Sequence, residues 1–216
     1  MVEGYKIILA SNSPRRKELL AGLGFEFQVR VMPDIDESYP EGLDVMRAAE
    51  YIAGKKAKAY QQTMADDELI ITADTVVIVG GEVLGKPADA AEAHDMLMKL
   101  SGRTHQVVTG VCLSTRQTTS SFSVVTDVTF KPLTEAEIDY YIKNYKPYDK
   151  AGAYGIQEWI GYIGCTGLRG SYYNVMGLPV QRIYTELQAF CHSSAWSSRL
   201  SAVMSSLSPP RSIMVE

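Results

Sequence analysis

Cysteine and long apolar runs are what this sequence most clearly lacks. Its three cysteines, Cys112, Cys165 and Cys191, lie far apart without zinc-site spacing, and their odd number argues against a disulfide framework. A reducing, cytoplasmic environment is therefore expected. No apolar run approaches the roughly 20 residues of a membrane-spanning helix, and a strand is predicted within a few residues of Met1. We therefore expect no signal peptide and no membrane partner.

An excess of basic residues is also missing. The sequence has 21 lysines and arginines against 25 aspartates and glutamates, which gives a net charge of −4. We expect no nucleic-acid partner for such a chain, so an anionic ligand must be held by local positive groups. The phosphate-loop pattern G-x-x-x-x-G-K-[ST] and the dinucleotide-binding pattern G-x-G-x-x-G are both absent. The three histidines form neither a metal-ligand spacing nor a Ser/His/Asp order.

What the sequence does contain is a hydrophobic pattern typical of an α/β protein. Hydrophobic residues make up 46% of its 216 residues, enough for one globular domain or one domain with two lobes. The apolar run 7–10 and the alternating segment 25–31 predict strands, whereas residues 44–62 have helical spacing. Residues 68–79 are the most apolar stretch and predict a central strand, followed by a glycine turn and a hairpin strand at 82–87. Further along, the pattern predicts helices 88–100, 134–144 and 178–190, strands 107–114 and 121–131, and short strands at 162–163 and 172–175.

Residues 191–216 differ from the rest of the chain. Serine crowds this segment, and two prolines stand near its end. We expect a flexible appendage beyond a functional domain of residues 1–190, with a weak added helix over 197–207 as the alternative.

The turn from the first strand into the first helix, Ser11-Asn12-Ser13-Pro14-Arg15-Arg16, predicts an anion site. Ser13 suits the N-cap and Pro14 suits the first helical position. The unpaired N–H groups and the positive dipole end of such a helix attract phosphate oxygens. Arg15 and Arg16 add planar guanidinium groups that match phosphate. The alternative is an ordinary capped helix with two solvated arginines.

Asp74 interrupts the most apolar predicted strand. A carboxylate in such a position is costly unless it is hydrogen-bonded, paired or metal-bound. This favours a metal ligand or a general base over a carboxylate that only caps the strand end. Taken singly, Glu37 in an acidic loop, Lys56 in a predicted helix and Lys86 after the hairpin are ordinary solvated charges.

The segment Asp149-Lys150-Ala151-Gly152-Ala153-Tyr154-Gly155-Ile156-Gln157 combines small residues with polar ones. Small residues let the backbone approach a ligand closely. The Gln157 amide both donates and accepts hydrogen bonds, which suits it to the edge of a nucleic base. The alternative is a tight loop in which Asp149 and Lys150 pair with each other.

Together these segments resemble the Maf family, also called septum formation inhibitor Maf-like proteins. The matching positions run in order from residue 6 to about residue 190 and leave out the serine-rich tail. They are Ser11-x-Ser13-Pro14-Arg15-Arg16, Asp36-Glu37, Lys56-Ala57, residues 73–77, Lys86-Pro87, Leu100-Ser101-Gly102, residues 149–157, Gly170-Ser171-Tyr172 and residues 175–179.

The resemblance implies the α/β fold that this family shares with inosine triphosphate pyrophosphatases, a long mixed sheet with a cleft between two lobes. It implies a house-cleaning hydrolase that splits a nucleoside triphosphate into the monophosphate and pyrophosphate. The branch whose loop reads Asp-Lys-Ala-Gly-x-Tyr-Gly-Ile-Gln is similar to dTTP/UTP pyrophosphatases, so dTTP and UTP are the expected substrates. A homodimer is expected from the family alone.

The resemblance also implies roles for single residues. Asp74 corresponds to the proton acceptor, and Arg15, Thr75 and Gln157 correspond to positions tied to substrate choice. A divalent cation, Mg²⁺ with Mn²⁺ or Co²⁺ as alternatives, is expected to bridge phosphate oxygens through Glu37 and Asp74. Whether Asp74 takes a proton or mainly holds the metal stays open at this point. The residues expected to hold the phosphates are Ser11, Ser13, Arg15, Arg16, Lys56 and Lys86.

Two other functions compete with this interpretation. A non-enzymatic nucleotide-binding regulator of cell division would bind nucleotide without turnover. Binding alone does not require an acid pair such as Glu37 and Asp74 beside the phosphates. A pyrophosphatase for a purine or another modified nucleotide would share the same chemistry, and Gln157 counts against it.

Overall fold

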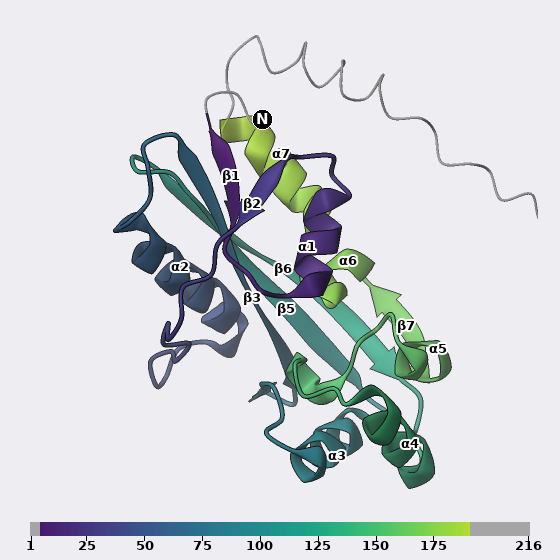
Figure 1. Ribbon diagram of the computed structural model, residues 1–216. Coiled ribbons are helices and arrows are strands. Elements are labelled where there is room, and N and C mark those ends of the chain that lie inside the picture. Colours follow the sequence, from purple (N-terminus) through teal and green to yellow (C-terminus); the bar gives the residue numbers. More distant parts are fainter. Residues whose placement is uncertain (1–4, 191–216) are drawn as a thin grey trace, which may run out of the picture.

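The computed structural model describes residues 5–190, and one mixed sheet of seven strands runs through them (Figure 1). The spatial order is β2-β1-β3-β5-β6-β7, and β4 pairs with β3. β1 pairs in parallel with β2 and β3, whereas the other pairings are antiparallel. The predicted α/β class with a long mixed sheet is thereby confirmed. The strands are β1 Lys6–Leu9, β2 Phe27–Val29, β3 Glu68–Val79, β4 Glu82–Leu84, β5 Thr104–Ser114, β6 Thr119–Phe130 and β7 Cys165–Arg169.

The helices cover both faces of this sheet. One long helix, α2, packs on one face, and α1 and α7 pack on the other face at the β1 end (Figure 1). Helices α3, α4 and α5 gather at the opposite end of the sheet. Within residues 5–190, no helix is long and apolar enough to cross a membrane. The helices are α1 Pro14–Ala21, η1 Val45–Arg47, α2 Ala48–Gln61, α3 Ala90–Leu100, α4 Glu135–Tyr145, η2 Ala151–Ala153, α5 Trp159–Gly164, α6 Tyr172–Met176 and α7 Val180–Phe190.

The central strand β3 has a gap along one edge. On this edge β1 pairs with residues 68–71, and β4 pairs with residues 77–79. Residues 72–76 therefore lack a strand neighbour there, although β5 pairs with them along the other edge. Asp74 and Thr75 are the two residues of β3 that are not buried. The gap is thus the place where the most buried strand of the sheet becomes accessible.

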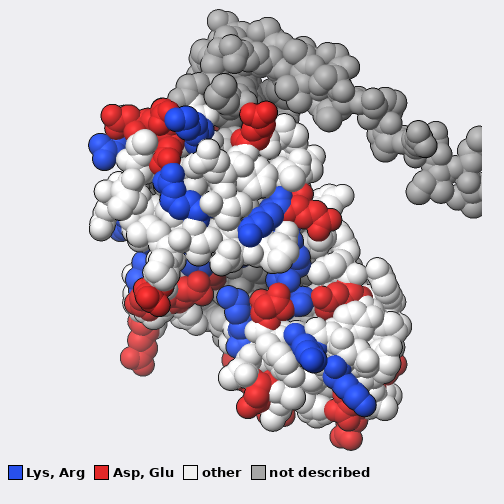
Figure 2. Space-filling view, in the orientation of Figure 1, with Lys and Arg blue, Asp and Glu red and all other residues white. Residues whose placement is uncertain are grey.

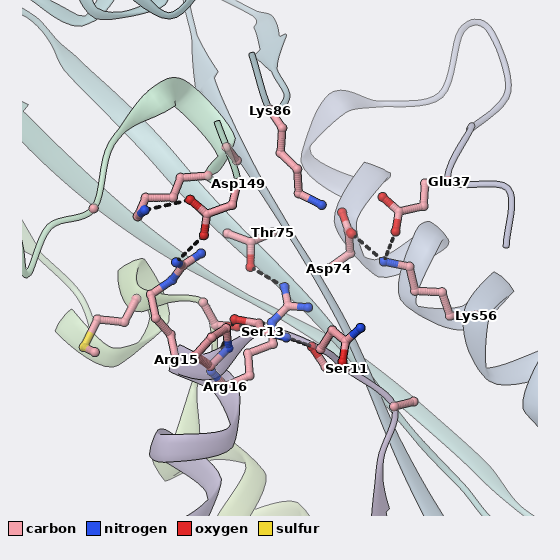
Figure 3. A pocket seen from close by; sticks show the side chains of 18 of the residues that line it. Ser11, Ser13, Arg15, Arg16, Glu37, Lys56, Asp74, Thr75, Lys86 and Asp149 are labelled. Carbon is pink, nitrogen blue, oxygen red and sulfur yellow. Dashed lines mark hydrogen bonds and ion pairs between the residues drawn. The ribbon is translucent and has the colours of Figure 1, made fainter. Parts of the chain in front are cut away.

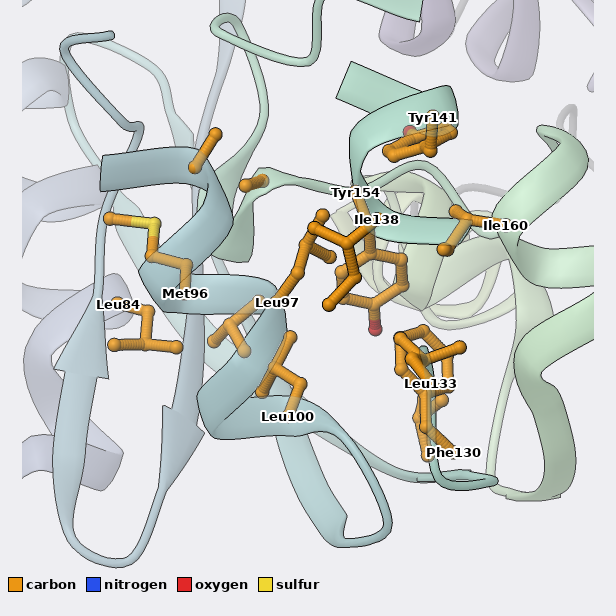
Figure 4. Packing of buried hydrophobic residues seen from close by; sticks show 14 of the residues in the cluster. Leu84, Met96, Leu97, Leu100, Phe130, Leu133, Ile138, Tyr141, Tyr154 and Ile160 are labelled. Carbon is orange, nitrogen blue, oxygen red and sulfur yellow. The ribbon is translucent and has the colours of Figure 1, made fainter. Parts of the chain in front are cut away.

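Two buried clusters share the face of β3 that carries its odd-numbered residues. One cluster joins Ile71 and Ala73 to side chains of α1 and α7. The other joins Val77 and Val79 to side chains of α3 and α4 (Figure 4). Thr75 lies between the two clusters along the strand, so neither cluster buries it.

Two of the predicted short strands are wrong. Residues 162–163 belong to helix α5, residues 172–175 belong to helix α6, and β7 forms between them. The Ser171 hydroxyl accepts a hydrogen bond from the Asn174 backbone N–H and caps α6. Gly177, with φ of +114°, ends the same helix. The two caps outweigh the strand preference of the tyrosines between them. The predicted tail, residues 191–216, lies outside the described residues.

Helix α2, which carries Lys56, lies directly on the backbone of β5. A Cβ atom added to Gly110 would come 2.2 Å from the Glu50 backbone nitrogen, well inside van der Waals contact. The buried Thr72 hydroxyl donates to the Ala53 carbonyl oxygen at 2.8 Å and ties β3 to the same helix. Gly110 therefore sets how closely α2 approaches the sheet.

We expect Gly110→Ala to destabilise the fold by roughly 1–3 kcal/mol, because α2 must move away from β5. The melting temperature measures this loss. Gly54→Ala is the matched control within α2, because nothing lies within 4 Å of a Cβ atom added there and alanine favours the helix. An unchanged melting temperature in Gly110→Ala would contradict the close contact.

The loop at residues 149–157 is held from behind by buried side chains. Nε2 of His105, on β5, lies 2.7 Å from the Tyr154 hydroxyl, and both side chains are buried. The Tyr141 hydroxyl of α4 accepts a hydrogen bond from the Gly155 backbone N–H at 3.0 Å. The core thereby holds the Tyr154 side chain and the Gly155 backbone N–H.

Burial lowers the pKa of His105 to about 4. Between about pH 6.5 and pH 4, His105 therefore stays neutral in the folded protein, whereas the same histidine takes up a proton in the unfolded chain. Stability falls as the pH drops from about 6.5 to about 4, and His105 accounts for about 2 kcal/mol of the loss between pH 7 and pH 5. We expect His105→Gln to show a smaller drop in melting temperature over this interval than the wild type. His94→Gln, altered on the partly exposed side of α3, should keep the wild-type drop. Equal drops in all three proteins would refute this role of His105.

Candidate active site

A cavity of about 470 Å³ opens at the gap in β3. Figure 2 shows the molecule hollowed between its two halves, with basic and acidic side chains around the hollow. The walls come from the β1–α1 turn, the loop after β2, α2, β3, the residues after β4, the loop after α4 and the end of α6. The structure places all ten predicted site residues in these walls: Ser11, Ser13, Arg15, Arg16, Glu37, Lys56, Asp74, Thr75, Lys86 and Gln157.

The β1–α1 turn has the predicted cap. Helix α1 begins at Pro14, and the Ser13 hydroxyl accepts a hydrogen bond from the Arg16 backbone N–H at 3.4 Å. The Ser11 hydroxyl accepts in turn from the Ser13 backbone N–H at 3.2 Å. These bonds engage the Ser13 and Arg16 N–H groups, and Pro14 has none, so Arg15 is left with an unpaired backbone N–H in the first turn of the described helix, where an anion can bind.

Arg16 is bound to the protein on three sides, and Figure 3 shows its contact with Thr75. Its Nε donates to the Gly177 carbonyl oxygen at 2.8 Å, and Nη1 donates to the Ala73 carbonyl oxygen at 2.8 Å. Nη2 donates to the Thr75 hydroxyl at 3.0 Å. Burial lowers the pKa of Arg16, against the raising effect of Asp74. Three of its five N–H groups are thus engaged, which leaves two for a ligand.

Arg15 is held by Asp149, a residue that sequence reasoning missed as a site member. Nη1 of Arg15 lies 2.8 Å from a carboxylate oxygen of Asp149, and the other oxygen accepts from Lys150 at 2.7 Å. Burial would raise the pKa of Asp149, but the hydrogen bonds from Lys150 and Arg15 outweigh it and lower the pKa to about 2. The pairing of Asp149 with Lys150, expected for a tight loop, therefore exists together with a contact to the β1–α1 turn. In the sequence, the one indication of this role of Asp149 is its place in the motif at residues 149–157.

Lys56 lies between the two carboxylates that were predicted to hold a metal (Figure 3). Its Nζ is 2.7 Å from Glu37 and 2.8 Å from Asp74. The side chains of Lys56 and Asp74 are only 12% and 13% exposed. Burial would raise the pKa of Glu37, but Lys56 and then Lys86 and Arg16 outweigh it, so the pKa lies below its usual value. Lys56 is therefore a site residue and not part of a solvated helix face.

The acid pair fits a cation that arrives with phosphate better than a cation bound by protein alone. The second oxygen of Glu37 and that of Asp74 have no hydrogen-bond partner among residues 5–190. In the same part of the chain, no group of three or more acidic, histidine or cysteine side chains could hold a metal. Mg²⁺ is commonly held by one or two carboxylates together with substrate phosphates and water. The donor set meets that requirement.

Gln157 lies in the cavity wall with an unused hydrogen-bond acceptor. Its side-chain Oε1 is buried and has no partner among the described residues. A buried acceptor without a partner is costly. Solvent does not reach this oxygen, so the amide has to turn before a ligand in the cavity can bind it, and the base-reading role of Gln157 stays a prediction.

Comparison with known proteins shows which family this chain resembles. The family model for Maf-like proteins matches residues 6–190 of the chain. The dTTP/UTP pyrophosphatase of Phocaeicola vulgatus is 63% identical over 187 residues, which cover 87% of this chain and 97% of that protein. The dTTP/UTP pyrophosphatase of Porphyromonas gingivalis ATCC 33277 is 59% identical over 192 residues, which cover 88% and 96%.

Among solved structures, the Staphylococcus aureus Ham1 protein aligns over 58% of this chain and 71% of its own, with a TM-score of 0.42 and 19% identity. The family match covers nearly every described residue and includes every predicted site residue. The chain therefore belongs to the family of Maf-like proteins.

Proposed function

We propose that this protein is a nucleoside triphosphate pyrophosphatase that prefers dTTP and UTP. Water attacks the α phosphorus, the bond to the bridging oxygen of the β phosphate breaks, and the products are the monophosphate and pyrophosphate. The observation that carries the proposal is Asp74, a carboxylate at the gap in a buried strand with one free oxygen and five cationic side chains in the same cavity. Curated relatives with this activity support it.

The positive groups suit a triphosphate. The N-terminus of α1 offers the Arg15 backbone N–H, and the Arg16 side chain has two N–H groups left for phosphate oxygens. Lys86 points into the cavity (Figure 3) and forms no ion pair within the described chain. Arg16 is held in place before substrate binds, so it stabilises the negative charge of the transition state without reorganising, whereas substrate binding must order Lys86.

The free oxygen of Asp74 is placed to take a proton. A general base must reach its water molecule directly by a hydrogen bond. Asp74 is held on one side by Lys56 at 2.8 Å, which leaves the other oxygen for water beside the α phosphate. The proton of the attacking water passes to Asp74, and pyrophosphate leaves with its charge held by the lysines and arginines.

Glu37 would hold a divalent cation, Mg²⁺ by preference, through the oxygen that Lys56 does not engage. Asp74 has one such oxygen, which either joins Glu37 on the cation or takes the proton of the water, so these two roles of Asp74 are alternatives. When bound, the cation supplies neutralisation of phosphate charge and polarises the phosphoryl oxygens. The ammonium group of Lys56 keeps the two acids together before the substrate and its cation arrive.

A panel of nucleoside triphosphates tests the activity. We expect pyrophosphate release with Mg²⁺, and a higher kcat/KM for dTTP and UTP than for CTP, GTP and ATP. Asp74→Asn should fold normally and lose roughly 10²–10⁴-fold in kcat, the usual contribution of a general base. Nucleotide binding without turnover in the wild type would instead establish a regulator, and a purine preference would establish a different pyrophosphatase.

Gln157 is the test of base recognition. Its amide can donate to O4 and accept from N3–H of thymine or uracil, whereas cytosine presents an amino donor in place of O4. We expect Gln157→Ala to raise KM for dTTP and UTP and to narrow their advantage over CTP, with kcat less affected. Gln188→Ala, outside the cavity walls, serves as the control. An unchanged substrate ranking in Gln157→Ala would remove Gln157 from base recognition.

A further inference from the structure

The Thr75 hydroxyl is the end of a buried chain of hydrogen bonds. Thr75 faces Thr109 across the β3–β5 ladder, and their hydroxyl oxygens are 3.0 Å apart. Arg16 donates to the Thr75 oxygen from the other side, also at 3.0 Å. Thr109 is fully buried, whereas Thr75 is partly exposed in the cavity wall. Thr75 is therefore the point at which this chain meets a ligand.

The direction of the chain follows from counting protons. The Thr109 hydroxyl lies 3.2 Å from the Asn174 main-chain carbonyl oxygen, which can only accept and which the Gly177 backbone N–H also reaches at 2.9 Å. The contacts of Thr109 with this carbonyl and with Thr75 are both hydrogen bonds only when Thr109 donates its one proton to the carbonyl. Thr109 must then accept from Thr75, and the single proton of Thr75 is used as well. Arg16 occupies one lone pair of Thr75. What Thr75 offers to the cavity is one remaining lone pair and no proton.

The end of the chain is firmly placed. Asn174 is fully buried in α6, and its side-chain nitrogen donates to the Val107 carbonyl oxygen at 3.1 Å and to the Thr126 hydroxyl at 3.0 Å. Thr126 is buried too, and the Ser171 backbone N–H donates to its hydroxyl at 3.0 Å. The carbonyl that orients Thr109 therefore cannot turn away without breaking several buried bonds, each costly to leave unmade.

We propose that Thr109 is a positioning residue that makes Thr75 an obligatory hydrogen-bond acceptor, so that the cavity selects a nucleoside N–H or O–H donor at this point. A phosphate oxygen, which only accepts, is disfavoured there. The inference rests on the proposed function and adds to it a chemical requirement on the nucleoside. N3 of uracil or thymine carries one proton, which cytosine lacks, so this N3–H is the donor to Thr75 only where Gln157 does not accept it. Where Gln157 accepts it, the donor to Thr75 is the 3′-hydroxyl of the sugar.

Thr109→Val tests the inference because it keeps the side-chain shape and removes the acceptor to which Thr75 donates its proton. The Thr75 hydroxyl can then donate into the cavity, so kcat/KM should rise for substrates that present an acceptor there, relative to substrates that present a donor. If the donor is N3–H, the ratio of kcat/KM for UTP over CTP should fall roughly three- to tenfold, the value of one neutral hydrogen bond. If the donor is the sugar hydroxyl, the ratio for dTTP over its 3′-deoxy analogue should fall instead.

Three further proteins make the result decisive. Thr109→Ser restores the donor to Asn174 and should restore the wild-type ratios. Thr72→Val removes another buried β3 hydroxyl bond, to Ala53 on the α2 face, and should lower the melting temperature without moving either ratio. If Thr109→Val does not fold, Thr75→Val removes the acceptor itself. It should reduce the kcat/KM ratio of UTP over CTP if the donor is N3–H, or that of dTTP over its 3′-deoxy analogue if the donor is the sugar hydroxyl.

Unchanged ratios in folded Thr109→Val would overturn the inference while leaving the proposed function intact. Failure of the wild type to release pyrophosphate, or to prefer UTP over CTP, would count against the proposed function first.

Discussion

The site depends on an arginine that stands where a strand would otherwise be. Along one edge of β3, the ladder stops at β1 and resumes at β4, and the Ala73 carbonyl oxygen between them is buried. A buried carbonyl without a partner is costly. Arg16 supplies the missing donor and also binds Thr75 and the Gly177 carbonyl. Because a side chain replaces a strand, the edge is satisfied and still open to ligands.

The same principle governs the other charges of the cavity. Asp149 holds Arg15, and Lys56 is held between Glu37 and Asp74. Cations of this kind on free side chains lose rotamer freedom when they bind phosphate. Here acidic partners from distant segments have already ordered Arg15 and Lys56. The acidic residues thus prepare a site for an anion, in a protein whose net charge is −4.

Local signals predicted the elements that local physics determines. The β-branched run at 68–79 coincides with β3, and Ser13 caps α1 as its position before Pro14 indicates. Helix α6 was missed because its tyrosines and valine favour strands, although Ser171 and Gly177, one on each side, are readable as caps. The β propensity was given more weight than the caps, and the caps prevailed.

Contacts between distant segments could not be read from the chain. Arg15 and Asp149 are 134 positions apart, and neither segment has a sequence feature that identifies the other as its partner. In the sequence Lys56 has the pattern of a solvated helix lysine. The two carboxylates that bind it, Glu37 in a loop and Asp74 in β3, lie far from it along the chain. The resemblance to a family pointed to ten residues that the structure brings to one cavity. The bonds among them, which decide whether a group donates or accepts, required the structure.

The gap in β3 limits how amino-acid substitutions can rearrange such a site during evolution. Neighbouring residues of a strand face opposite sides of a sheet, yet at an open edge Asp74 and Thr75 both reach one cavity. Their Cα atoms are separated by a single peptide unit, about 3.8 Å. Shifts of helices or loops can widen or narrow the cavity, but they cannot separate these two residues. Substitutions around Thr75 can therefore change what the cavity accepts, while the peptide bond keeps the Cα atom of Asp74 beside that of Thr75.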